Sequence, residues 1–157
     1  MGHQAIVKGV GVSVDSEDVG IPAAIIFARE EILPILISPS QAKAIQYALE
    51  GIPLERPFTH DLLVDMVTDF GGAIDRVRID DLADGTYYAK IDVELFRNGE
   101  RKRFVYDARP SDAIALALRV DCPIEVSDEV LDAAGHAPEE FEIEGLDTER
   151  REDTDIG

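Results

Sequence analysis

Two short segments of the sequence place an arginine beside hydroxyl, histidine and carboxylate side chains. The first, RPFTHD from Arg56 to Asp61, leads into a predicted helix. Backbone N–H groups at a helix start favour an anion, so Arg56 and Thr59 are candidate phosphate-binding residues. His60 and Asp61 are candidate catalytic residues, either as a base with its orienting carboxylate or as a metal-ligand pair. An ordinary helix start explains the same residues, with Thr59 as N-cap and His60 on the surface.

The second segment, DARPSD, runs from Asp107 at a predicted strand end to Asp112 at a helix start. Magnesium or manganese takes oxygen ligands, so Asp107 and Asp112, with Asp61 as a third carboxylate, are candidate metal ligands and catalytic residues. Arg109 and Ser111 are candidate phosphate-binding residues, because a cation there stabilises charge that develops on phosphate. The alternative is structural: Ser111 and Asp112 cap a helix, and Asp107 pairs with Arg109.

A locally basic stretch surrounds a predicted hairpin tip and consists of Arg97, Arg101, Lys102 and Arg103. It could guide a polyanion, or it could keep an exposed strand edge from aggregating. The glycine-rich segments match neither a P-loop nor a dinucleotide fingerprint, and no serine nucleophile elbow is present.

The charge balance restricts the partners and the surroundings of the chain. Thirty-three acidic and 15 basic residues among 157 give a net charge of -18. Molar salt shortens the Debye length to about 3 Å and screens the resulting repulsion, so we interpret the surface as halophilic. The alternative is an acidic protein that avoids nucleic acid. With Cys122 as its one cysteine, no signal peptide and no apolar stretch that could span a membrane, the chain is predicted to be cytoplasmic.

Apolar periodicity predicts the elements that position these residues. Period-two patterns, short apolar runs and turn signals predict strands, whereas helical spacing with caps predicts helices. The predicted strands cover residues 4–14, 23–28, 32–37, 74–82, 87–95, 101–107 and 123–126, and the predicted helices follow Ser38, Thr59, Asp112 and Ser127. This order indicates a single α+β domain, with a mixed, mainly antiparallel sheet and hairpins packed against three to four helices. The domain is predicted to occupy residues 1–137, with an acidic C-terminal tail at 138–157.

Three motifs together resemble the bifunctional nuclease domain family. They are RPFTHDLL at 56–63, DGTYYAKI at 84–91 and DARPSDAIALALR at 107–119. The resemblance extends from about Ile6 to Ala134, and together with the acidic composition it leads us to expect a halophilic, archaeal-type member.

The resemblance implies hydrolysis of phosphodiester bonds in both DNA and RNA, because the family takes its name from plant members with both activities. Nucleic acid at high salt is the implied substrate, and the candidate residues of the two arginine-containing segments are the implied site. We further expect a homodimer or a higher homo-oligomer. The alternative is a non-catalytic regulatory or protein-interaction module of the same fold.

Overall fold

A seven-stranded sheet with the strand order β3-β2-β1-β7-β4-β5-β6 forms the centre of the described chain. The computed structural model describes residues 2–14 and 20–140. Within them the elements are, in order, β1 (Gly2–Val14), β2 (Gly20–Ala28), β3 (Glu31–Leu36), α1 (Pro39–Glu50), α2 (Thr59–Asp69), β4 (Gly72–Ala83), β5 (Thr86–Arg97), β6 (Glu100–Ala108), α3 (Pro110–Val120), β7 (Ile124–Ser127), α4 (Asp128–Ala134) and a 3₁₀ turn at Pro138–Glu140. The predicted α+β class and mixed sheet are confirmed.

Most neighbouring strands pair antiparallel, and the exception joins the two halves of the sheet. β7 pairs parallel with β4 and antiparallel with β1. The hairpin turns at Asp84-Gly85 and Asn98-Gly99 have positive φ at both residues, which is the backbone of a tight two-residue hairpin. These turns fix the register of β4, β5 and β6 and therefore decide which side chains share a face.

Helix α3 lies at the centre of the fold. Its residues Ala113 to Ala117 are at most 2% exposed, and it contacts α1, α2, β4 and β5. Because most side chains of α3 are small or apolar on all sides of the helix, neighbouring elements pack against it from several directions. Helix α1 begins after a capping box in which the Ser38 hydroxyl accepts from the Gln41 N–H.

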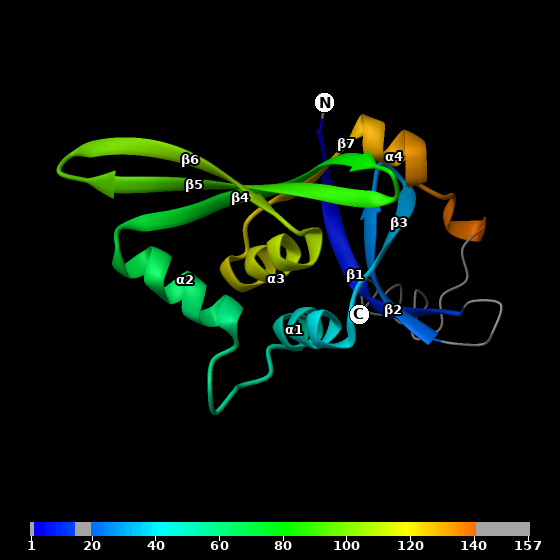
Figure 1. Ribbon diagram of the computed structural model, residues 1–157, viewed down its shortest axis with the longest axis horizontal. Coiled ribbons are helices and arrows are strands. Elements are labelled where there is room, and N and C mark those ends of the chain that lie inside the picture. Colours follow the sequence, from blue (N-terminus) through cyan, green and yellow to red (C-terminus); the bar gives the residue numbers. More distant parts are fainter. Residues whose placement is uncertain (1, 15–19, 141–157) are drawn as a thin grey trace, which may run out of the picture.

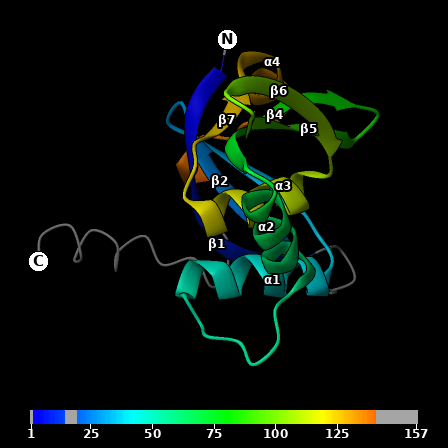
Figure 2. The ribbon, with the colours of Figure 1, turned by 90° about the vertical axis from the view of Figure 1, so that its left-hand side faces the viewer.

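Strands β5 and β6 extend as a long arm away from β1, β2 and β3, and α2 lies below that arm (Figure 1). Viewed toward the arm, α1, α2 and α3 all lie on the same side of β4 and β5 (Figure 2). Every residue of α2 is described, and none of them is buried. Val64 and Val67 of α2 are only partly buried where they pack against the core, so no closed core forms between α2 and the arm.

The start of α2 differs from the prediction, and most of the predicted tail lies outside the described residues. Phe58, not Thr59, is the N-cap of α2, because the Asp61 carboxylate accepts from the Phe58 N–H and Thr59 already has helical backbone. The predicted tail begins with the 3₁₀ turn, and residues 141–157 lie outside the described residues. No helix in the described ranges is long and apolar enough to cross a membrane.

Candidate active site

A groove of about 1380 Å³ lies between α1, α2, the start of α3 and the inner face of β4, β5 and β6. Its lining is mainly apolar and aromatic. Leu63 of α2 and Phe70, which follows the end of α2, contribute from one side, and Phe104 and Tyr106 contribute from β6. The polar part of the lining consists of Ser40, Gln41 and Lys43 from α1, Thr59 and His60 from α2, and Asp107, Arg109 and Asp112 around the start of α3. The groove is large enough for an extended ligand, and its lining includes acidic and basic side chains.

A hydrogen bond between His60 and Asp112 joins the two arginine-containing segments. The distance from His60 Nε2 to Asp112 Oδ1 is 2.9 Å. Arg109 donates to the other oxygen, Oδ2, through Nε at 3.1 Å and Nη2 at 2.9 Å. The His60 side chain is 17% exposed, whereas that of Arg109 is 71% exposed. The mostly buried imidazole of His60 and the accessible guanidinium of Arg109 thus share the carboxylate of Asp112.

Asp112 is held in its charged form by these two neighbours. Burial raises the pKa of Asp112, but the hydrogen bonds from His60 and Arg109 outweigh that effect and leave the pKa below its usual value. His60 Nδ1 is also buried and has no hydrogen-bond partner within the described residues. If Nε2 carries the proton given to Asp112, Nδ1 has a free lone pair that can accept a proton.

Asp61 is engaged in holding α2 against α3. Its Oδ1 accepts from Arg119 Nε at 2.7 Å, and its Oδ2 accepts from the Phe58 N–H at 2.9 Å. Arg119 is only 8% exposed and also donates to the Ala115 carbonyl. Both carboxylate oxygens of Asp61 are therefore used in structural contacts.

Asp107 interacts with Lys90 rather than with Asp112. In the β5–β6 register, Tyr106 is opposite Ile91 and Phe104 is opposite Val93, and all four line the groove. Successive side chains of a strand point to opposite faces, so the Asp107 side chain leaves from the other face. There Asp107 Oδ1 is 3.7 Å from Lys90 Nζ. The Asp107 side chain is 75% exposed at the rim of the groove.

The predicted phosphate-binding residues differ in accessibility. Arg56 and Thr59 are exposed where the chain enters α2, and Arg109 is exposed where it enters α3. Ser111 is 5% exposed and lies within the α3 packing, so it cannot meet a phosphate directly. Arg56 has no carboxylate partner among the described residues.

The donors do not form a preformed metal site. Across the described ranges there is no group of three or more His, Cys, Asp and Glu side chains that could hold one ion. Asp61 is occupied by Arg119 and Asp112 by His60 and Arg109, while Asp107 leaves the sheet on the other face. The three carboxylates predicted as metal ligands are thus not brought together.

Comparison with known families adds an independent observation. Residues 26–139 match the model of the bifunctional nuclease domain. The chain belongs to the bifunctional nuclease domain family. An uncharacterized protein of Mycobacterium tuberculosis is 42% identical over 121 residues, which cover 77% of this chain and 70% of that protein.

Plant members of the family are more distant and longer. Bifunctional nuclease 1 of Oryza sativa subsp. indica is 30% identical over 96 residues, covering 61% of this chain and 29% of the plant protein. Bifunctional nuclease 2 of Arabidopsis thaliana is 29% identical over 110 residues, which cover 67% of this chain and 33% of the plant protein. This chain therefore spans about a third of each of these plant proteins.

All of the candidate site residues lie inside the matched bifunctional nuclease domain. Sequence reasoning missed Arg119, which holds Asp61, and the aromatic groove residues Tyr87, Phe104 and Tyr106. A signal for Arg119 was present, since it is the one charged residue between Ala113 and Val120 and needs a partner when that helix is buried. The aromatic residues gave no comparable signal, because alternating strands carry such residues routinely.

Proposed function

We propose that this protein is a nuclease that hydrolyses phosphodiester bonds of DNA and RNA at the polar part of the groove. The observation that carries the proposal is the His60–Asp112 hydrogen bond, which joins segments 52 residues apart beside an exposed arginine. Proton transfer and phosphate binding are the two tasks that this cluster is chemically suited to perform. Membership of the bifunctional nuclease domain family and the names of the plant relatives support the same reaction.

In this proposal each residue of the cluster has a separate role. Arg109 exchanges its contact with Asp112 for the substrate phosphate, and the exposed Arg56 binds an adjacent phosphate. His60 accepts the proton of the attacking water at Nδ1, while Asp112 orients the ring through Nε2. As the new P–O bond forms, the P–O bond to the leaving oxygen breaks, and this oxygen takes a proton from solvent. Because Nδ1 is covered, substrate must displace part of the groove lining to reach it. Asp61 positions α2 and takes no part in the chemistry.

Dependence on a divalent metal remains a separate prediction. Magnesium or manganese would supply Lewis acidity and charge neutralisation at the phosphate. Because the described carboxylates form no three-ligand cluster, we assign none of the proposed steps to an ion. Activity with and without EDTA tests this prediction directly.

A non-catalytic interaction module is the second candidate function. The mainly apolar lining of the groove and the net charge of -18 favour it, because both suit a protein partner better than a polyanion. The two candidates differ in a measurable way, since only the nuclease requires His60 for turnover.

The deciding experiment measures cleavage of single- and double-stranded DNA and RNA in molar potassium chloride, with magnesium, with manganese and with EDTA. His60→Gln is compared with wild type and with His3→Gln. His3 is a matched control, because it also pairs with an aspartate, Asp128, at 2.6 Å, but it does not line the groove. The nuclease predicts loss of cleavage in His60→Gln alone. Equal rates in all three proteins would favour the interaction module.

Salt adaptation and a cytoplasmic location are also part of the proposal. The charge of -18 supports the salt adaptation, because screening by molar salt removes most of the self-repulsion. We expect the free energy of unfolding to rise between 0.1 M and molar potassium chloride. A free energy of unfolding that stays constant or falls as the salt concentration rises would contradict the halophilic interpretation.

A further inference from the structure

Two accessible aromatic rings and a cation follow one another on the groove face of β6. Phe104 and Tyr106 line the groove, and their rings are stacked with a centroid distance of 6.2 Å and an interplanar angle of 19°. Phe104 is 38% exposed and Tyr106 is 53% exposed. Side chains two positions apart share a face of a strand, so Lys102 continues this face toward the arm tip. This face of β6 therefore offers flat apolar surface next to positive charge.

More aromatic side chains face the same groove from the elements around β6. They lie at the two ends of α2 and on β5, and they are Phe58, Phe70, Tyr87 and Tyr88. The groove volume of about 1380 Å³ exceeds the ~300–1,000 Å³ of a typical small-molecule pocket. The groove is therefore suited to an elongated ligand that carries several flat groups, rather than to one compact small molecule.

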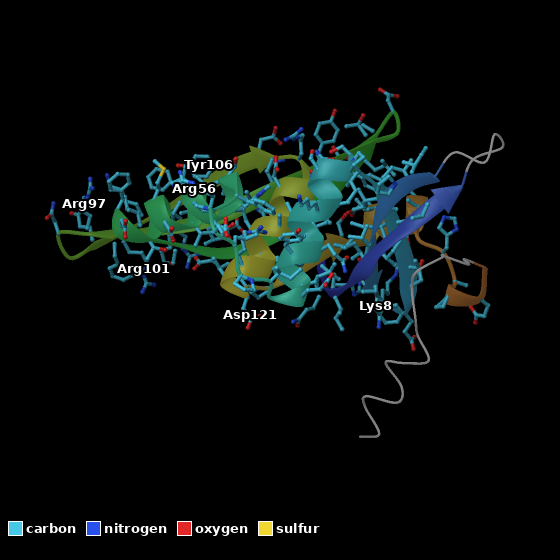
Figure 3. The ribbon with its side chains drawn as sticks, turned by 90° about the horizontal axis from the view of Figure 1, so that it is seen from below. Lys8, Arg56, Arg97, Arg101, Tyr106 and Asp121 are labelled. Carbon is cyan, nitrogen blue, oxygen red and sulfur yellow. The ribbon has the colours of Figure 1, made fainter. Side chains whose placement is uncertain are left out.

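The arm tip is locally basic, although the chain carries a net charge of -18. Figure 3 shows Arg97 and Arg101 at the far end of the arm. The Glu94 carboxylate is shared between Arg101 at 2.9 Å and Arg103 at 3.8 Å. Arg97 and Lys102 have no carboxylate partner among the described residues. A chain of phosphates that leaves the groove toward the tip would therefore meet cations whose charge is not neutralised.

We propose that the groove binds a single-stranded nucleic acid, with bases stacked on Phe104 and Tyr106 and with phosphates directed to the cations of the arm tip. Stacking on aromatic side chains tolerates any sequence, because every base has a flat π face. A duplex keeps its bases paired inside the helix and offers only phosphates and base edges. As a statement about the substrate this rests on the proposed nuclease function, and it adds the form of that substrate, an unpaired strand of DNA or RNA.

A strand bound in this way would pass the residues of the proposed reaction. Tyr106 and Arg109 are three positions apart and line the same groove as His60. Three residues span at most about 10 Å even when fully extended. A base stacked on Tyr106 therefore brings a neighbouring phosphate toward the guanidinium of Arg109.

High salt separates the contribution of stacking from that of charge attraction. The net charge of -18 opposes a polyanion at low ionic strength. Contacts between cations and phosphates weaken steeply as salt rises, with a slope of about -0.7 per neutralised phosphate of a single strand on logarithmic scales. Binding that persists in molar potassium chloride thus reports mainly on the aromatic rings.

The first test measures fluorescence anisotropy in molar potassium chloride with EDTA, in the His60→Gln protein, so that binding is observed without turnover. The labelled probes are a short oligothymidylate, the same oligomer paired with oligoadenylate, and an abasic oligomer with the same number of phosphates. The oligothymidylate should bind about 30-fold more tightly than either of the other probes. This factor corresponds to about 2 kcal/mol, the lower bound for two stacked bases.

The second test removes one aromatic ring at a time in the same background. Tyr106→Leu should weaken oligothymidylate binding about 5- to 150-fold, which corresponds to ~1–3 kcal/mol for one stacked base. Tyr106→Phe keeps the ring and should bind as tightly as the parent. Phe96→Leu is the matched control, because Phe96 is also 53% exposed but does not line the groove. Circular dichroism checks folding, and Phe104→Leu replaces Tyr106→Leu if that variant fails to fold.

Several outcomes would overturn the preference for unpaired strands. They are equal or tighter binding of the duplex, equal binding of the abasic oligomer, no binding of any probe, and a loss in Phe96→Leu as large as in Tyr106→Leu. Cleavage by wild type is measured separately. Cleavage without selective binding would retain the nuclease and exclude the stacking groove, whereas selective binding without cleavage would retain the groove and exclude the nuclease.

Discussion

Substitution of Asp61 by asparagine tests whether this residue holds helices together or takes part in chemistry. Asp61 accepts from Arg119 Nε at 2.7 Å and from the Phe58 N–H at 2.9 Å. The Asp61→Asn variant keeps an amide oxygen that can still accept from Phe58, but it lacks the negative charge opposite Arg119. We therefore expect a loss of stability with little direct effect on the reaction.

The size of the loss follows from the burial of the two partners. Hydrogen bonds to charged groups contribute about 1.5–3 kcal/mol, and breaking a fully buried ion pair costs about 3–5 kcal/mol. The Arg119 side chain is 8% exposed and that of Asp61 is 31% exposed, so the pair is only partly shielded from water. The free energy of unfolding should fall by about 2–3 kcal/mol.

Denaturant unfolding in molar potassium chloride measures this change, together with Arg119→Met and the double variant. The coupling energy of the cycle should be about 1–2 kcal/mol, because the two side chains are in direct contact. Asp65→Asn is the matched control, since Asp65 is exposed on the same helix. Its effect should stay within about 0.5 kcal/mol.

Two results would refute the structural role of Asp61. One is an Asp61→Asn protein as stable as the Asp65→Asn control. The other is a stable, folded Asp61→Asn protein whose cleavage is lost as completely as in His60→Gln. Either result would return Asp61 to the catalytic or metal-binding role that the sequence indicates.

Three further predictions concern protonation and backbone geometry. The pKa of Asp112 is lower in the folded than in the unfolded protein, so the charged Asp112 stabilises the fold at pH values above its unfolded-state pKa. This stabilisation is lost as the pH falls through the folded-state pKa. The free energy of unfolding should therefore fall less between pH 7 and pH 3 in Asp112→Asn than in wild type. Burial raises the pKa of Cys122 to about 11, so thiol alkylation at pH 8 should be about two orders of magnitude slower in folded than in unfolded protein, and equal rates would contradict this. Gly71 has φ +90 and an added Cβ would lie 2.7 Å from the Phe96 carbonyl oxygen, whereas Gly85 has φ +77 and open space. Gly71→Ala should thus lower the melting temperature more than Gly85→Ala, and the reverse order would disprove the steric argument.

Local patterns were sufficient to predict the elements and part of the site. The period-two alternation from Tyr87 to Leu95 and the Asn98-Gly99 turn predicted the β5–β6 hairpin, because turn chemistry and side-chain alternation act between near neighbours. The expectation that the two arginine-containing segments converge is supported by the His60–Asp112 hydrogen bond. The boundary at residue 137 stays a prediction, since most of the tail lies outside the described residues.

Other parts of the site depended on contacts that no local pattern specifies. Thr59 has the chemistry of an N-cap, yet the helix begins one residue earlier, because Asp61 already satisfies the Phe58 N–H. Asp107 and Asp112 are five positions apart, but the strand sends Asp107 toward Lys90 while the helix turns Asp112 toward His60. The two carboxylates therefore have different partners in the described chain, and a shared metal site stays a prediction.

By itself the sequence determined the family, the order of strands and helices and a set of candidate residues for phosphate binding and proton transfer. These depend on residue type and on spacing over a few positions. Only the tertiary structure decided which carboxylates meet which cations, because each pairing depends on how α2, α3 and the arm pack together. That packing assigned Asp61 to Arg119, Asp112 to His60 and Arg109, and left the apolar faces of α2 and β6 uncovered.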